Sequence, residues 1–190
     1  MQQDTMMRWG FNSINNKDKG IGFRFNTLSK EKIIIIPIIL VIFLSFIPIK
    51  LLLALDYKSG DYIKSWRIED RDTFIVEHTH SVELTTVSEK YAIEGGDIIL
   101  IEAKFHSFGA GLPATTPYKF EIGDQEFRIY DINQKMDGLV YRTATERANH
   151  RLILDNKSYY FLDFTEARRG LRFVVDKTPY IYFIIREGLF

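Results

Sequence analysis

The stretch that decides the fold is residues 73–107, TFIVEHTHSVELTTVSEKYAIEGGDIILIEAKFHS. Apolar and polar residues alternate along much of it, which is the pattern of strands that bury one face. On one such face Phe74, Val76 and Val82 lie together with two histidines. Gly95-Gly96 has the composition of a two-residue hairpin turn. The stretch therefore predicts antiparallel strands joined by turns.

The same pattern continues to the C-terminal end. Runs rich in Ile, Val, Phe and Tyr alternate with gaps rich in Gly, Asp, Asn and Pro. Two segments, Thr145–His150 and Thr165–Gly170, are predicted to form helical turns. This spacing predicts an all-β domain, an antiparallel β-sandwich or a barrel-like fold. The predicted strands are Thr73–Val82, Val87–Glu94, Asp97–Ser107, Tyr118–Ile122, Glu126–Ile132, Leu139–Thr143, Arg151–Leu154, Ser158–Asp163, Leu171–Asp176 and Tyr180–Arg186.

An apolar segment precedes this domain. Ile33–Ile49 contains no charged residue, and Leu51–Leu55 continues the apolar run beyond Lys50. About 20 apolar residues suffice for a helix to cross a bilayer, so we predict a transmembrane helix over 33–55. A buried core helix is the alternative. Basic residues outnumber acidic ones before the segment, which places the N-terminus in the cytoplasm.

These observations predict an order of segments along the chain. Residues 1–32 form a cytoplasmic polar tail, 33–55 an uncleaved signal anchor, 56–71 a connector and 72–190 an extracytoplasmic β-rich domain. A cleaved signal peptide fits less well, because the polar leader is long and no small-x-small site ends the apolar run.

Composition excludes several classes of function. The 25 basic and 25 acidic residues balance, which argues against a nucleic-acid-binding protein. The chain has no cysteine. Disulfides, a thiolate nucleophile and cysteine-ligated zinc are therefore excluded.

Polar residues on the predicted inner face suggest a site. Counting back from the Gly95-Gly96 turn places Glu89 opposite Glu102. A two-residue turn at Leu84-Thr85 would place His80 opposite Glu89. His80, Glu89 and Glu102 would then form one row across three strands, and two facing carboxylates require a compensating group.

This row permits three interpretations. It can be a hydrogen-bonded polar network with a structural role. It can bind a metal ion such as zinc, manganese or calcium, or a polar ligand, with His78, His80, Glu89 and Glu102 as candidate metal ligands. It can also be an acid–base site with His80 as the base. No strong catalytic motif such as HExxH is present, so we assign no catalytic residue and no cofactor.

A glycine-rich loop follows the third predicted strand. It has the sequence Ser107-Phe108-Gly109-Ala110-Gly111-Leu112-Pro113. Gly109 and Gly111 allow a tight turn or a close approach to a partner, and Pro113 stiffens the exit. The loop is either a corner of the β domain or an anion-binding nest.

These motifs together resemble a known family. His80-Ser81-Val82-Glu83, Glu89, Glu102 with Phe105, and the glycine-rich loop are similar to the domain of unknown function 1850. The resemblance implies a small extracytoplasmic protein, often with an N-terminal signal or anchor, encoded beside TAXI-type TRAP transporters of organic acids. It implies no established activity. The residues that it marks for a binding site are His80, Ser81, Glu83, Glu89, Glu102, Gly109, Gly111 and Pro113.

We therefore expect a single-pass membrane protein that is an accessory of a TRAP transporter and is not an enzyme. Its partners would be the membrane, the transporter permease or its substrate-binding protein. The alternative functions are a module that binds a metal or a carboxylate ligand and, less favoured, a membrane-tethered hydrolase that uses His80.

Overall fold

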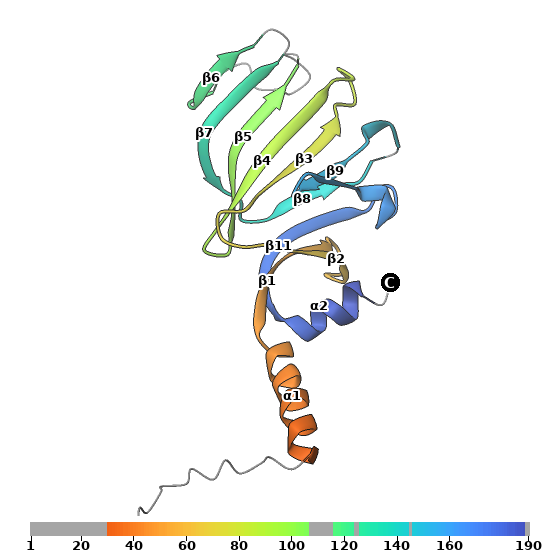
Figure 1. The fold of residues 1–190 in the computed structure, drawn as a ribbon. Helices are drawn as coiled ribbons and strands as arrows, with labels where there is room; N and C mark the ends of the chain where they lie inside the picture. The colour runs from red at the N-terminus through yellow and green to blue at the C-terminus, as the bar shows by residue number, and fades with distance from the viewer. Residues whose placement is uncertain (1–29, 107–115, 124–125, 145, 189–190) are drawn as a thin grey trace, which may run out of the picture. The chain divides into compact units, whose positions relative to one another are not determined.

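The computed structural model describes residues 30–106, 116–123, 126–144 and 146–188 (Figure 1). Residues 39–188 of this range belong to one compact unit, which contains two antiparallel sheets. The first sheet has the order β2-β1-β11-β8, with bounds Tyr62–Arg67, Pro48–Asp56, Gly170–Pro179 and Leu139–Arg142. The second has the order β10-β9-β3-β4-β5-β7-β6, with bounds Lys157–Tyr160, Arg151–Leu154, Thr73–Thr79, Thr86–Glu94, Asp97–Phe105, Phe127–Lys135 and Lys119–Ile122.

Helices are few in the described residues. The α-helices are α1, Lys30–Ser45, and α2, Tyr180–Glu187. The 3-10 helix η1 (Glu146–Ala148) lies where the sequence predicted a helical turn. A second 3-10 helix, η2 (Phe161–Asp163), replaces the end of the predicted strand Ser158–Asp163. The all-β prediction for the domain is confirmed, because every strand pairing is antiparallel and both sheets are open.

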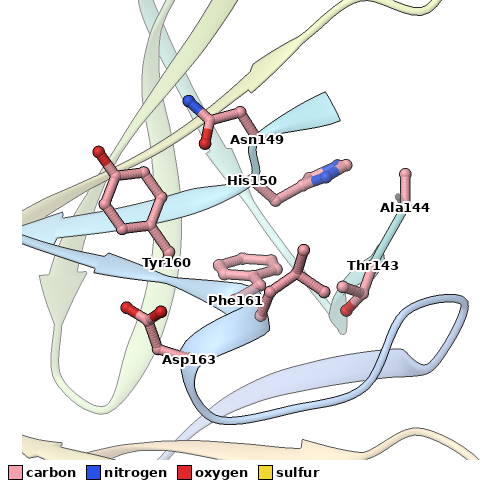
Figure 2. A pocket seen from close by; sticks show the side chains of 8 residues that line it. Thr143, Ala144, Asn149, His150, Tyr160, Phe161 and Asp163 are labelled. Atoms are coloured by element: carbon pink, nitrogen blue, oxygen red, sulfur yellow. The ribbon is translucent and has the colours of Figure 1, made fainter. Parts of the chain in front are cut away.

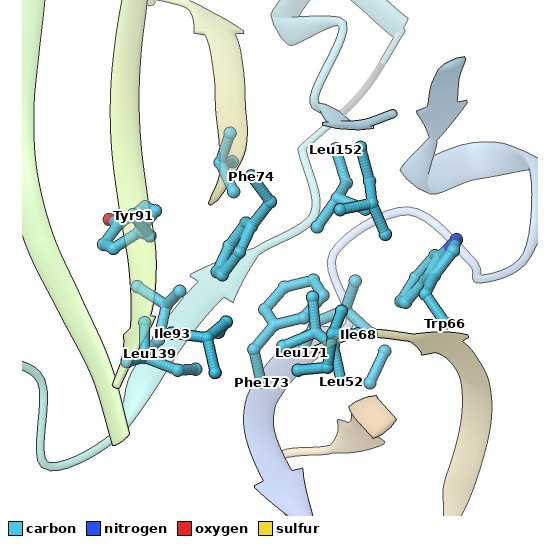
Figure 3. Packing of buried hydrophobic residues seen from close by; sticks show 14 of the residues in the cluster. Leu52, Trp66, Ile68, Phe74, Tyr91, Ile93, Leu139, Leu152, Leu171 and Phe173 are labelled. Carbon is cyan, nitrogen blue, oxygen red and sulfur yellow. The ribbon is translucent and has the colours of Figure 1, made fainter. Parts of the chain in front are cut away.

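The two sheets share one hydrophobic core (Figure 3). Leu52 and Trp66 enter it from the first sheet, and Phe74, Tyr91 and Ile93 enter it from the second. These side chains occupy alternate positions of their strands, as the apolar pattern predicts. A smaller cluster is formed by Val87, Phe105, Ile129 and Ile132 toward the β6 edge of the second sheet. Burial of these faces holds the two sheets together.

The predicted hairpin turn at Gly95-Gly96 is confirmed. Gly95 and Gly96 have φ of 61° and 108°, and they connect Glu94 to its partner Asp97. The turn between β9 and β10 uses Asp155-Asn156, whose φ values are also positive. Positive φ at both central positions is the geometry that suits a two-residue hairpin.

The predicted membrane helix is wrong from residue 48 onward. Helix α1 ends at Ser45, and the apolar run continues as strand β1. Leu52 faces the shared core, while Leu53 points to the opposite face and is only 7% exposed. Leu53 lies opposite Ser65, which contacts helix α2. A strand covered on both faces has a continuous apolar sequence and lacks alternation. Along the described ranges of the chain, no helix is both long enough and apolar enough to cross a membrane.

The last predicted strand, Tyr180–Arg186, is helix α2. Its final residue, Glu187, accepts hydrogen bonds from the Tyr62 hydroxyl and, at 2.7 Å, from the Ser65 backbone N–H of β2. The Arg186 guanidinium lies 4.6 Å from the Tyr62 ring centroid. These contacts hold α2 over the outer face of the first sheet. The predicted connector 56–71 also contains strand β2, which the sequence pattern did not indicate.

Candidate functional site

The hairpin of β4 and β5 begins in the predicted register and then leaves it. Tyr91 is paired with Leu100, in the register counted from Gly95-Gly96, but Lys90, and not Glu89, lies opposite Glu102. A bulge between these pairs adds one residue to β5. Because successive side chains point to opposite faces, a shift of one residue moves Glu102 to the outer face of the sheet. The predicted pairing of Glu89 with Glu102 is therefore wrong.

Glu102 has a different partner on that outer face. Its carboxylate accepts hydrogen bonds from Arg128 of β7, at 2.8 Å from Nε and 2.5 Å from Nη2. Both nitrogens donate to the same oxygen, Oε2, and the result is a charge-assisted ion pair between neighbouring strands. Glu102 thus stabilises the pairing of β5 with β7, and it does not face the core.

His80 lies in the loop that joins β3 to β4. Strand β3 ends at Thr79, which is paired with Thr86, so the loop is longer than the predicted two-residue turn. The His80 N–H donates to the Thr85 carbonyl at 2.8 Å, and its ring Nδ1 accepts from the Glu83 N–H at 3.2 Å. His80 therefore stabilises its own loop, and the predicted position opposite Glu89 is wrong.

The other predicted residues are distributed as follows. Ser81 is exposed in the loop after β3, and Glu83 is half-buried there. Gly109, Gly111 and Pro113 lie outside the described residues. The four candidate metal ligands, His78, His80, Glu89 and Glu102, do not come together. In the part of the chain that the structure describes, no three His, Asp or Glu side chains form a group able to hold a metal ion.

Glu89 remains on the inner face, where two tyrosines hold its carboxylate. The Tyr141 hydroxyl donates to Glu89 Oε2 at 2.5 Å, and the Tyr91 hydroxyl lies 3.2 Å from the same oxygen. The two hydroxyls are 2.7 Å apart. Tyr91 comes from β4 and Tyr141 from β8, so this triad links the two sheets across the core. Burial, reinforced by the nearby Glu89 charge, raises the pKa of both phenols.

Two histidines stack beside this triad. His78 of β3 and His150, just before β9, have ring centroids 5.1 Å apart and an interplanar angle of 10°. On its other side His150 stacks on Phe161 at 5.6 Å. Burial lowers the pKa of His78, and burial with the proximity of His78 lowers the pKa of His150 to about 4. His150 is therefore neutral at pH 7 and can donate or accept a hydrogen bond.

His150 also lines a cavity of about 360 Å³ (Figure 2). Figure 2 shows the Phe161 ring at its centre, with His150 and Thr143 on one side and Tyr160 and Asp163 on the other. The hydroxyl of Thr143 is buried and has no hydrogen-bond partner among the described residues, as is also true of His78 Nδ1. The lining of the cavity is completed by Ala144, Asn149 and Leu162.

This cavity has the properties of a ligand site. Its volume lies within the range of about 300–1,000 Å³ that small-molecule sites occupy. Leu162 supplies apolar surface, Phe161 is fully buried in the wall, and Asn149, Tyr160 and Asp163 supply hydrogen-bonding groups. The arrangement can hold a small, partly apolar molecule. Among the described residues that line it, none is a nucleophile activated by a base, which acyl-transfer chemistry requires.

The sequence carried a signal for this site that the polar row obscured. His150 is an even number of residues from the buried Leu152 and Leu154, and Tyr141 is two residues from the buried Leu139. Residues at such spacings point to the same face of a strand. Alternation alone therefore places both polar rings on inner faces. Their meeting with His78 depends on which strands are neighbours, and only the tertiary structure shows this.

Comparison with known proteins places the site within a family. The model of the family described as Domain of unknown function (DUF1850) matches residues 74–161, which extend from β3 to the start of η2. The match includes His78, Glu89, Tyr141 and His150. No curated protein and no solved structure matches the chain. The segment that forms most of the second sheet and the histidine pair thus belongs to the domain of unknown function DUF1850 family.

Proposed function

We propose that this chain is a membrane-anchored accessory protein whose β domain works on the extracytoplasmic side of the membrane. The observation that carries the proposal is the surface of α1. The large apolar side chains between Ile34 and Leu44 are each between 48% and 70% exposed, on every side of the helix. A helix that is apolar all round is normally buried in a protein or a bilayer. Insertion into a bilayer would cover these side chains.

The connection from α1 to the domain supports work at the membrane surface. Only Phe46 and Ile47 separate the end of α1 from strand β1. The Ile47 carbonyl accepts a hydrogen bond from the Tyr180 N–H at the start of α2. The linker between α1 and the first sheet is therefore short, and an inserted α1 would hold the domain close to the headgroups.

Fractionation of cells that produce the full chain tests the anchor. Wild-type protein is expected to stay with the membranes through an alkaline carbonate wash. A variant with Ile35→Asp, Ile39→Asp and Ile42→Asp is expected to leave them, because each buried charge opposes insertion by roughly 2.5–3.5 kcal/mol.

The matched control changes two exposed apolar residues of the β3–β4 loop, Val82→Asp and Leu84→Asp, whose exposed fractions are 68% and 72%. This control should remain in the membranes. Release of the wild-type chain by carbonate would disprove the anchor. Protease digestion of right-side-out vesicles would show the side, since the proposed orientation exposes the β domain to the enzyme.

The proposed partner is a TAXI-type TRAP transporter, through its permease or its substrate-binding protein. The support for this choice is the resemblance of the sequence motifs to a family whose genes lie beside such transporters. Co-production of the chain with a tagged permease and with a tagged binding protein should yield a complex with one of them. Organic-acid uptake that is unchanged after deletion of the chain would argue against an accessory role.

A second candidate function is the binding of a small ligand in the His150 cavity. The unpaired Thr143 hydroxyl favours it, because a buried hydroxyl without a partner costs about 1–3 kcal/mol. In the ligand-free protein, Thr143→Val is expected to raise the free energy of unfolding by about 1 kcal/mol, as measured by urea denaturation.

The control Thr73→Val changes an exposed threonine of β3 and should shift stability by less than about 0.5 kcal/mol. If Thr143→Val instead destabilises the protein, the hydroxyl is already paired and the argument for a ligand there is lost.

A further inference from the structure

A second cavity, of about 460 Å³, lies on the outer face of the first sheet. Val140 and Arg142 of β8 line it, and they alternate with Leu139 and Tyr141, which face the core. Gly170 of β11, opposite Arg142, forms part of its floor. Its lining is completed by Tyr57, Lys58 and Arg168. The cavity is therefore separated from the His150 cavity by the sheet itself.

The charged residues that line this cavity are all basic. Lys58, Arg142 and Arg168 line it, and no acidic residue of the described ranges does. None of the three forms an ion pair with another described residue. Elsewhere on the sheets arginines are neutralised by carboxylates, as Arg128 is by Glu102 and Arg151 is by Glu77. Cations that converge without a partner repel one another, and a bound anion relieves that repulsion.

Asp56, which precedes Tyr57 in the chain, is already engaged by another residue. Asp56, at the end of β1, accepts a hydrogen bond from Arg169 Nε at 2.5 Å and another from the Lys58 backbone N–H at 2.9 Å. Asp56 is only 8% exposed. Its charge therefore serves Arg169 and the turn after β1, and it leaves the cationic heads in the cavity free for an external anion.

One wall of the cavity is apolar and closely fitted. The Tyr57 N–H donates to the Gly170 carbonyl at 2.9 Å, and a Cβ added at Gly170 would lie 2.9 Å from the Tyr57 Cβ. Only glycine lets Tyr57 lie so close to β11. The exposed fractions of Tyr57 and Val140 are 59% and 42%. The anion that fits this site thus has an apolar body next to its charge.

Distance from the anchor indicates the source of the anion. Strand β1 runs from Pro48, beside α1, to Asp56, beside the cavity. Its nine residues span roughly 30 Å at about 3.3 Å per residue. A lipid headgroup at the α1 end of the sheet lies beyond the reach of Lys58, Arg142 and Arg168. If α1 is inserted as proposed, this separation favours a ligand from solution over a lipid headgroup.

We propose that the cavity formed by Tyr57, Lys58, Val140, Arg142, Arg168 and Gly170 binds a free organic carboxylate. The guanidinium groups pair with the carboxylate, for which the planar arginine fork is well suited. The Tyr57 ring and Val140 contact the apolar body. The inference goes beyond the anchored accessory role and does not depend on the His150 cavity, but its choice of a free solute over a lipid rests on the proposed anchor.

Titration of the full chain, purified in dodecyl maltoside, with benzoate tests the proposal by calorimetry or ligand-observed NMR. Benzoate is expected to bind the wild type. Arg168→Asn and Arg142→Gln are each expected to weaken this binding at least tenfold, because a hydrogen bond between charged groups is lost. Inorganic phosphate, which has no apolar body, should bind more weakly than benzoate.

The control variant is Arg71→Asn. Arg71 and Arg168 both have positive φ, 75° and 67°, a conformation that asparagine tolerates. The two substitutions therefore change charge and backbone preference alike, but Arg71 does not line the cavity. Benzoate affinity should be unchanged in Arg71→Asn, and thermal melting should show that both variants are folded.

Three results would overturn the proposal. The first is a wild type that does not bind benzoate, and the second is an Arg168→Asn variant that binds it as the wild type does. The third is displacement of benzoate by phosphatidylserine, but not by phosphatidylcholine, in nanodiscs, which would make a lipid headgroup the ligand. Equal benzoate affinity in both lipids supports a free solute.

Discussion

Replacing Phe161 with alanine is expected to lower the free energy of unfolding by about 3–5 kcal/mol, the usual cost of truncating a buried phenylalanine. The Phe161 ring is 0% exposed. It lies against Phe164 and Phe173, each with a centroid distance of 5.7 Å, and it stacks on the His150 ring. The truncation would open a void that joins the His150 cavity, and the surrounding rings cannot all move to fill it.

The measurement is chemical or thermal unfolding of the full chain in detergent. The melting temperature should fall by roughly 10 °C, at about 2–4 °C for each kcal/mol in a domain of this size. The neighbouring Leu162 is 39% exposed, so Leu162→Ala should cost about 1 kcal/mol or less. Equal losses for the two variants would show that Phe161 is not the centre of this packing.

Acidification from about pH 7 to about pH 5 is expected to destabilise the protein by about 1 kcal/mol through His150. Burial, with a smaller effect from His78, lowers the pKa of His150 from 6.5 to about 4 in the folded chain. Between these two values the unfolded chain binds more protons, so stability is complete above pH 6.5 and is lost as the pH falls. The full shift would correspond to about 2 kcal/mol at pH 5, and the partial exposure of His150 reduces that figure.

The test is a series of urea denaturations between these pH values. His150→Phe retains a ring against Phe161 but cannot be protonated, so its stability should change less with pH than that of the wild type. His106→Gln removes an exposed imidazole that contacts the Thr86 carbonyl. It should retain the wild-type slope. A His150→Phe variant with the wild-type slope would contradict this explanation.

Most strands of the domain could be predicted from local pattern. Strand β9 has the predicted bounds Arg151–Leu154, and the turn of the β4–β5 hairpin lies at Gly95-Gly96. Alternation and turn residues are local properties of the chain, so they can be recognised without knowledge of its neighbours. The errors lie where the local pattern is ambiguous: in the continuous apolar runs of β1 and α2, which have no alternation that would separate strand from helix.

The candidate site was predictable only in part. Glu89 and His78 lie on the inner face, as the parity of Phe74 and Val76 indicates. Their predicted companions, His80 and Glu102, depended on the registers of two hairpins. A loop longer than two residues removed His80 from the strand, and a bulge turned Glu102 to the other face. Each error arises from one or a few inserted residues, which a count along the chain does not detect.

The sequence alone determined the local facts: an all-β domain, the strands whose apolar residues alternate, and the hairpin turn at Gly95-Gly96. The tertiary structure decided which faces of these strands meet. It brought His78 of β3 onto His150 and joined Tyr141 of β8 to Glu89 of β4. It also gathered Lys58, Arg142 and Arg168 in one cavity. The physical reason is that alternation is set by backbone geometry within a strand, whereas register and neighbour depend on packing between residues distant in sequence.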